Sequence, residues 1–244
     1  FCEKPMDLSL DTVSKLIKTI DEADINLFLA FNRRFDPNFK RVKEIVSNGN
    51  IGEIQIIKIT SRDPSPPPIS YIKTSGGLFL DMSIHDFDMA RFISGKEIVE
   101  VDAKGVVFND VEIEKNGDID TAVITLTLEN NAMVVIDNSR KAAYGYDQRI
   151  EVFGSKGMCG SDNKLHDNFY LFDKKGSQGS LPMDFFMDRY SESYYNEMKS
   201  FIECIKNNKK PPVNGKDGLM ALVIGLAAKK SMQEKRRVKI SEIL

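Results

Sequence analysis

The first fifty residues alternate between helical and extended hydrophobic patterns. Asp7 or Ser9 can cap a helix whose apolar side chains recur at helical spacing. Residues 25–31 form a continuous apolar run of strand length, which predicts a strand buried on both faces. Asp36-Pro37 then has the composition of a helix cap followed by a first-turn proline. The pattern indicates that residues 1–50 are the end of an alternating α/β domain.

Strand patterns dominate the remainder of the chain. In Thr121–Leu128 polar and apolar positions alternate, which predicts a strand with two distinct faces, and Asn130-Asn131 predicts a hairpin turn after it. Further strands are predicted near residues 54–60, 133–137, 148–153 and 169–172, and two helices near residues 194–205 and 217–234. Residues 51–244 are therefore expected to form an α+β domain with a large, mostly antiparallel sheet.

Composition narrows the classes of partner. The net charge is −2, with 29% charged residues, so nothing points to nucleic acid or an anionic membrane. The longest apolar stretch, Leu219–Ala228, is about half of what a bilayer requires. The three cysteines are far apart and form neither a C-x-x-C motif nor a disulfide framework, which is typical of a reducing compartment. We expect a cytoplasmic protein.

The most informative motif places Asp81 four residues before His85, one of two histidines in the chain. On one helix these positions share a face, and Asp88 falls on the same stripe. A carboxylate that holds an imidazole in one tautomer is typical of a general base acting near neutral pH. The alternative is purely structural, with Asp81 capping a helix and His85 as its hydrogen-bond partner.

Four short segments of the chain are informative when taken together: Glu3-Lys4-Pro5, Gly76-Gly77, Asp81-x-x-x-His85 and Asp88-x-x-Arg91. At these spacings they resemble the Gfo/Idh/MocA family of NAD(P)-dependent oxidoreductases. Two longer stretches, residues 61–77 and 138–149, resemble the inositol 2-dehydrogenase branch, and the resemblance follows all 244 residues in order. It implies NAD as the cofactor, with NADP left open, and homodimers or homotetramers formed through the sheet. A polyol is the implied substrate, with no metal.

One departure from the family pattern is large. The family begins with a Gly-rich phosphate-binding turn, whereas this chain has no G-x-G-x-x-G, and Gly154, Gly157 and Gly160 are spaced for a hairpin turn instead. We therefore expect residues 1–50 to be the C-terminal remnant of a Rossmann domain, in a fragment that is inactive alone because the pyrophosphate site is absent. Residues 51–244 would be the substrate-binding and oligomerisation domain.

The resemblance also implies roles for single residues in hydride transfer from a secondary alcohol. His85 would be the general base, Asp81 would orient it, and Lys4 would bind the substrate oxygen. Glu3, Lys4 and Pro5 would lie at the nicotinamide end of the cofactor site.

Three further residues are predicted to contact the polyol. Arg34, for which Arg33 is a close competitor, follows a buried strand, where open α/β sheets bind ligands. Asp63 and Tyr144 could pair with ring hydroxyls, although a turn Asp before proline and a packed Tyr are the simpler explanations. Asp88 and Arg91 are expected to form a structural pair.

The resemblance thus implies NAD-dependent oxidation of myo-inositol to a 2-keto-inositol. Two alternatives stay open at this point. One is another sugar or cyclitol dehydrogenase of the same family. The other is a ligand-sensing protein without turnover on the same scaffold, which the joint presence of Lys4, Asp81 and His85 argues against.

Overall fold

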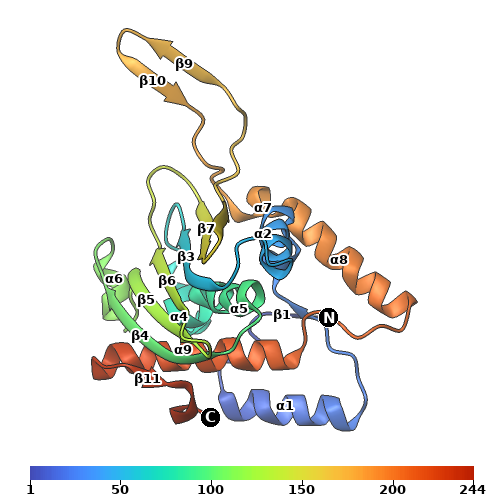
Figure 1. The fold of residues 1–244 in the computed structure, drawn as a ribbon. Coiled ribbons are helices and arrows are strands. Elements are labelled where there is room, and N and C mark those ends of the chain that lie inside the picture. Colours follow the sequence, from blue (N-terminus) through green and yellow to red (C-terminus); the bar gives the residue numbers. More distant parts are fainter.

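A mixed seven-stranded sheet forms the centre of the protein, which a computed structural model describes over residues 1–244 (Figure 1). The strand order is β11-β4-β5-β6-β3-β7-β8, and only β3 and β6 pair in parallel. The strands are β3 (Ile54–Arg62), β4 (Ile98–Val106), β5 (Thr121–Leu128), β6 (Met133–Ser139), β7 (Asp147–Gly154), β8 (Gly157–Ser161) and β11 (Val238–Lys239). The predicted antiparallel character is confirmed for every other neighbouring pair.

The strand patterns in the sequence identify the sheet well. Strand β5 has the predicted bounds, and its side chains alternate between buried and more exposed positions. The predicted hairpin joins it to β6, and Gly154 and Gly157 flank the tight turn between β7 and β8. The outer face carries Val123, Met133 and Phe153, each about half exposed. Self-association through this face stays a prediction, which light scattering of the natural full-length protein would test.

Helices cover the other face of the sheet. The long helix α9 (Gly215–Glu234) runs along it together with α5 (Ser83–Ser94), and both contribute to a core of 33 buried residues (Figure 1). The other helices after residue 36 are α2 (Pro37–Ser47), α3 (Ile69–Ser75), α4 (Leu78–Asp81), α6 (Val111–Lys115), α7 (Phe186–Arg189), α8 (Ser191–Lys206) and the short η2 (Ile240–Glu242). None of the helices combines the length and apolar composition needed to cross a membrane.

The N-terminal segment follows the predicted order of elements. Strands β1 (Cys2–Glu3) and β2 (Leu29–Ala30) pair in parallel, with α1 (Leu10–Glu22) between them and the 3₁₀ helix η1 (Asn32–Phe35) after them. Ser9 caps α1 and Asp36 caps α2, as expected. The strand predicted over residues 25–31 is shorter than expected. Its residues 28–31 are buried, but β1 is its only partner strand and pairs with just two residues.

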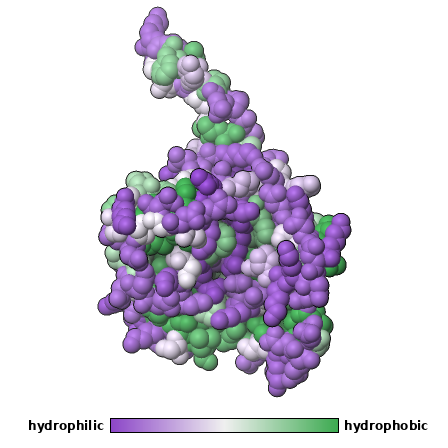
Figure 2. Space-filling model, turned by 45° about the vertical axis from the view of Figure 1, so that its right-hand side comes forward, coloured by the Kyte–Doolittle hydropathy of each residue, from purple (hydrophilic) through white to green (hydrophobic).

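A thin arm projects from the body between β8 and α7 (Figures 1 and 2). It consists of β9 (Tyr170–Asp173) and β10 (Gly176–Gly179), which pair only with each other. All residues of both strands are exposed. The strand predicted near residues 169–172 is therefore present but lies outside the main sheet.

Asp81 and His85 do not lie on one continuous helix, contrary to the prediction. Helix α4 ends at Asp81 and α5 begins at Ser83, with Met82 between them as the cap of both. Across this junction the two side chains form no hydrogen bond or ion pair with each other, although they are four positions apart; Asp81 binds Lys4, Tyr71 and Arg140 instead.

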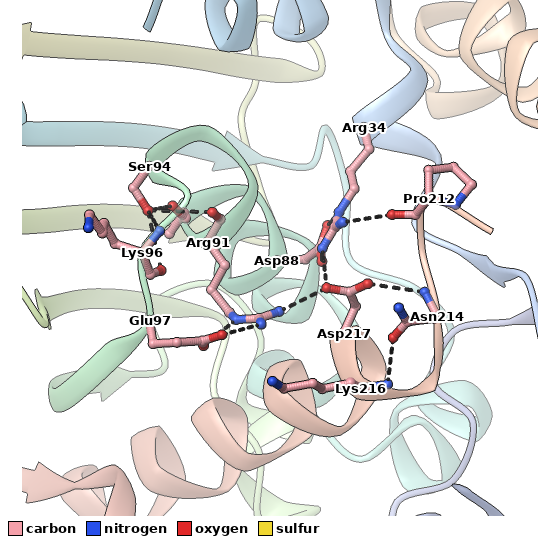
Figure 3. Close-up of polar contacts among 11 residues, drawn as sticks. Arg34, Asp88, Arg91, Ser94, Lys96, Glu97, Pro212, Asn214, Lys216 and Asp217 are labelled. Atoms are coloured by element: carbon pink, nitrogen blue, oxygen red, sulfur yellow. Dashed lines mark hydrogen bonds and ion pairs between the residues drawn. The ribbon is translucent and has the colours of Figure 1, made fainter. Parts of the chain in front are cut away.

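A buried ionic network ties η1, α5 and the start of α9 together (Figure 3). The Arg34 guanidinium donates two hydrogen bonds to Asp88, at 2.8 and 2.5 Å, and a third to Asp217 at 2.9 Å. Arg91 donates to Asp217 at 3.2 Å and to both carboxylate oxygens of Glu97 at 2.8 Å. The predicted Asp88–Arg91 pair is therefore wrong, because each residue binds a partner from another part of the chain.

We expect Arg34→Ala to destabilise the protein by about 3–5 kcal/mol, because it leaves the buried Asp88 carboxylate without its main cation. Urea unfolding measures this change. The matched control is Arg41→Ala, which removes an exposed ion pair with Glu44 on α2 and should change stability by less than about 1 kcal/mol. Equal effects of the two substitutions would contradict a stabilising role for the network.

Candidate active site

A cavity with a volume of about 840 Å³ gathers most of the predicted functional residues. It lies where β1, η1, the proline loop after β3 and the junction of α4 and α5 meet. Its charged and titratable lining residues are Glu3, Lys4, Arg33, Asp63, Tyr71, Asp81, His85, Arg140, Tyr146, Tyr190 and Tyr194. Residues that are more than 130 positions apart in the sequence thus line the same cavity. Pro5, by contrast, is not part of the lining.

Lys4 enters the cavity from the end of β1. Its ammonium group donates to the backbone oxygen of Asp81 at 2.8 Å and lies 3.4 Å from Asp81 Oδ1. Because an ammonium group carries a further N–H, one donor is left for a ligand oxygen. Burial lowers the pKa of Lys4 from its ordinary value, and the neighbouring Asp81 carboxylate offsets part of that effect.

Asp81 accepts hydrogen bonds from several elements at once. Tyr71 donates its hydroxyl to Oδ1 at 2.8 Å, and both terminal nitrogens of Arg140 lie 3.4 Å from Oδ2. Arg140 also lies 3.7 Å from Asp118, whose Oδ1 accepts from the Leu78 backbone N–H at 2.9 Å and so satisfies the start of α4. The carboxylate is thereby fixed in direction. The sequence reasoning missed Arg140, because nothing in a loop arginine signals complete burial.

His85 stands beside this group but does not bind Asp81. Its Nδ1 is buried and has no hydrogen-bond partner, while the ring packs edge-on against Phe31 at a centroid distance of 6.0 Å. Burial, together with the positive charges of Lys4 and Arg33, lowers the pKa of His85 well below its ordinary value. The imidazole is therefore neutral at neutral pH. The predicted contact by which Asp81 orients His85 is wrong for this structure.

Asp63 is held at the cavity by backbone bonds on both sides. Its N–H donates to the Ser139 carbonyl at 2.8 Å, and its own carbonyl accepts from the Ala142 N–H at 2.7 Å. Burial raises the pKa of Asp63 to about 6, although the positive charges of Arg140 and Arg33 act in the opposite direction. The side chain makes no hydrogen bond to protein groups that would compete with a ligand hydroxyl, so the predicted placement of Asp63 at a ligand cavity agrees with the geometry.

Arg33, rather than Arg34, reaches the cavity. Its Nη1 donates to Asp86 at 2.6 Å and to the Ser61 hydroxyl at 2.9 Å, and Asp86 also accepts from Asn138 Nδ2 at 2.8 Å. All of these side chains are at least 95% buried, so they form a rigid polar floor beneath the cavity. The sequence alone does not decide which of the two arginines reaches the cavity, because neighbouring residues on a 3₁₀ helix point in different directions.

Two predicted substrate contacts lie outside the cavity. Arg34 belongs to the ionic network described above. Tyr144 donates its hydroxyl to Asp147 at 2.6 Å and accepts from Arg62 at 2.9 Å, on the outer side of its loop. Tyr146, two residues later, lines the cavity instead. The structure therefore brings neither residue to the cavity, for the same reason in both cases. A polar residue next to a functional one gives no sequence signal of which way it points.

The position of the cavity relative to β1 and β2 suits a dinucleotide ligand. The parallel strands β1 and β2 lead into the cavity at their carboxyl ends, where open α/β sheets bind such ligands. Glu3 and Lys4 are the lining residues of β1 and its exit, and they could contact the nicotinamide or its ribose. A glycine-rich turn for the pyrophosphate is not found among the 244 residues.

Comparisons with known proteins agree with this geometry. Residues 39–159 match the GFO/IDH/MocA C-terminal domain. Myo-inositol 2-dehydrogenase from Thermotoga maritima is 55% identical over 244 residues, which are 100% of this chain and 73% of that protein. A crystal structure of a putative myo-inositol dehydrogenase from Sinorhizobium meliloti superposes with a TM-score of 0.96 at 45% identity, covering 98% of this chain and 73% of that one.

A more distant relative carries ligands. The crystal structure of scyllo-inositol dehydrogenase from Lactobacillus casei, with NAD(H) and scyllo-inositol bound, is 31% identical with a TM-score of 0.88. It covers 98% of this chain, and this chain covers 72% of it. The family matched by the domain model, the extent of the identity and the shared fold lead to one conclusion: the chain belongs to the Gfo/Idh/MocA family of oxidoreductases.

Proposed function

We propose that this protein is an NAD-dependent inositol 2-dehydrogenase that oxidises myo-inositol to the 2-ketone. The observation that carries the proposal is the single cavity that the Lys4 ammonium, a neutral His85 imidazole and the Asp63 carboxylate all line. The relatives at 45% and 55% identity, named for the same reaction, support the substrate. A ligand-sensing protein would not need a neutral base beside a buried lysine.

The chemistry requires the loss of one hydride and one proton from the same CH–OH group. Bound NAD supplies the hydride acceptor. The free N–H of Lys4 would bind the reacting oxygen and stabilise the negative charge that develops on it. His85 would take the hydroxyl proton, because its imidazole is neutral and one edge of the ring faces the cavity. Asp81 would act on Lys4, to which it is hydrogen-bonded, rather than on His85.

The remaining hydroxyls of the ring need partners of their own. Asp63 can accept from them, while Arg33 and Arg140 contribute positive charge from the floor and wall of the cavity. Because most hydroxyl positions coincide between inositol stereoisomers, such a set separates polyols from simple alcohols more strongly than it separates isomers.

We infer further that residues 1–50 complete the nucleotide-binding domain and that residues 51–244 form the substrate and oligomerisation domain. Three observations support this division: β1 pairs in parallel with β2, their carboxyl ends lie at the cavity, and the sheet after residue 50 is mostly antiparallel. NAD is proposed over NADP because the inositol-bound relative carries NAD(H).

The test of function is a panel of kcat/KM values for the natural full-length protein with NAD. We expect myo-inositol to lead, scyllo-inositol, glucose and xylose to follow, and simple alcohols such as propan-2-ol to be slower by about 10⁴ or more, because they leave buried polar groups unpaired. A preference for an aldose would replace inositol by a sugar as the substrate. Tight polyol binding without turnover would favour the sensing alternative.

His85→Ala should lower kcat by about 10²–10⁴, the usual contribution of a positioned general base. Lys4→Ala should lower kcat while changing the melting temperature little, since its ammonium binds Asp81 at the cavity surface and not in the core. Steady-state kinetics and thermal unfolding on the same samples measure both effects. Near-normal turnover by His85→Ala would show that another group takes the proton.

The pH dependence of substrate binding should follow the ionisation of the Asp63 carboxyl group and not that of the His85 imidazole. With a pKa of about 6, Asp63 is ionised at pH 7 and becomes protonated as the pH falls below about 6, where it can no longer accept freely from inositol hydroxyls. We expect kcat/KM to fall on the acid side with an apparent pKa near 6 in the wild type. Asp63→Asn should lower kcat/KM and remove this limb, whereas residual activity in His85→Ala should retain it.

Stability gives an independent check of the same ionisation. Because the pKa of Asp63 is raised in the folded state, the stability it contributes is complete below the unfolded pKa of about 4 and is lost as the pH rises through about 6. Asp63→Asn should therefore gain stability relative to the wild type between about pH 4 and pH 7, by about 1–3 kcal/mol. A constant difference across this range would contradict the assignment.

A further inference from the structure

Tyr71 lines the cavity and shares the Asp81 carboxylate with Lys4. It lies on α3, immediately after the proline loop, and the residue is 47% exposed. Its hydroxyl donates to Asp81 Oδ1 at 2.8 Å, the same oxygen that the Lys4 ammonium approaches only to 3.4 Å. Tyrosine and lysine therefore share one carboxylate oxygen, and the tyrosine has the shorter bond.

The other contacts of Asp81 limit where the Lys4 ammonium can form a closer bond to this carboxylate. Arg140 occupies the Oδ2 side at 3.4 Å, and the Asp81 backbone oxygen already holds one Lys4 N–H at 2.8 Å. A short ion pair between Lys4 and Asp81 would thus have to form at Oδ1, where Tyr71 now donates. Such a pair would shorten the 3.4 Å contact of the second Lys4 N–H and weaken the positive charge of the ammonium toward a ligand oxygen.

We propose that Tyr71 is a positioning residue for this reaction, which occupies Asp81 Oδ1 and so keeps the Lys4 ammonium directed at the substrate oxygen. The proposal rests on the function proposed above. Tyr71 itself exchanges no proton with the substrate. Its hydroxyl acts on Lys4 only through the shared carboxylate. The proline loop before Tyr71 restricts the position of the tyrosine, because each proline restricts its own φ angle.

The test uses Tyr71→Phe in the natural full-length protein, with Tyr144→Phe as the matched control. Each substitution removes one tyrosine-to-aspartate hydrogen bond, of 2.8 and 2.6 Å respectively, but Tyr144 and its partner Asp147 lie outside the cavity. We expect Tyr71→Phe to lower kcat for myo-inositol about tenfold, the value of one hydrogen bond to a charged group, with KM changed less than about twofold. The control should keep the wild-type kcat.

Two readouts separate positioning from general damage to the fold. If Tyr71→Phe slows the chemical step, myo-inositol deuterated at the oxidised carbon should show a larger isotope effect on kcat than it does with the wild type. A partly unfolded sample would lower kcat without changing that ratio. An unchanged kcat and isotope effect in Tyr71→Phe would overturn the proposal while leaving the proposed function intact, because the wild type would still oxidise inositol.

A third readout needs no turnover, so it decides the proposal even if no polyol is oxidised. Free of Tyr71, Lys4 should bind Asp81 Oδ1 more closely, which raises the pKa of the ammonium and lowers the fraction of reactive amine. Acetylation of Lys4 by acetic anhydride at fixed pH, followed by mass spectrometry, should therefore slow by about threefold for a rise of half a pKa unit. An equal or faster rate in Tyr71→Phe, relative to Tyr144→Phe, would overturn the proposal.

Discussion

The burial of the Arg33 guanidinium against Asp86 is the interaction on which the arrangement of the site depends. Arg33 belongs to η1, after the β1–β2 pair, while Asp86 belongs to α5 and its other partners to the sheet. Two charges removed from water are stable only when their remaining donors and acceptors are satisfied. Ser61 and Asn138 meet that requirement from β3 and β6. The N-terminal segment is thereby fixed to the sheet in one orientation.

This fixed orientation of the N-terminal segment determines which charged groups meet in the cavity. Lys4 reaches Asp81 only because β1 is held against the junction of α4 and α5. The positive charges of Arg33 and Lys4 then act on His85 from close by, and together with burial they keep its imidazole neutral. The same Arg33 lowers the pKa of Asp63 against the larger effect of burial. One buried cation therefore favours both a neutral base and an ionised acceptor at neutral pH.

The sequence was sufficient for features that depend on local periodicity or on capping chemistry. The alternation in Thr121–Leu128, the Asp36-Pro37 helix start and the glycine-flanked turn after β7 all appear where they were predicted. Lys4, Asp63, Asp81 and His85 were also found, and they meet in one cavity. Residue type and motif spacing carry this information, because each of these residues is set by elements whose ends can be recognised in the sequence.

The errors concern the direction of side chains within correctly located segments. Arg33 and Arg34 differ by one position, yet one enters the cavity and the other the network around Asp217. Tyr144 and Tyr146 divide in the same way. The break at Met82 likewise separates Asp81 from His85, although the spacing alone favours contact. The directions of Arg33 and Arg34 depend on partners more than fifty residues away, and Tyr144 binds Arg62 from a distant strand as well as the nearby Asp147. The relation between Asp81 and His85 depends on a helix junction whose geometry tertiary packing determines.

The division between the two arginines also explains how the site can combine stability with reactivity. The Arg34 guanidinium is hydrogen-bonded to the carboxylates around it. Its network joins η1 to α5 and α9 and contributes no group to the lining of the cavity. The cavity groups are less completely satisfied: His85 Nδ1 has no partner, and Asp63 makes no side-chain bond within the protein. Groups left in this state destabilise the fold unless a ligand pairs with them. The adjacent network offsets that cost, so the unsatisfied groups can be kept in position for substrate.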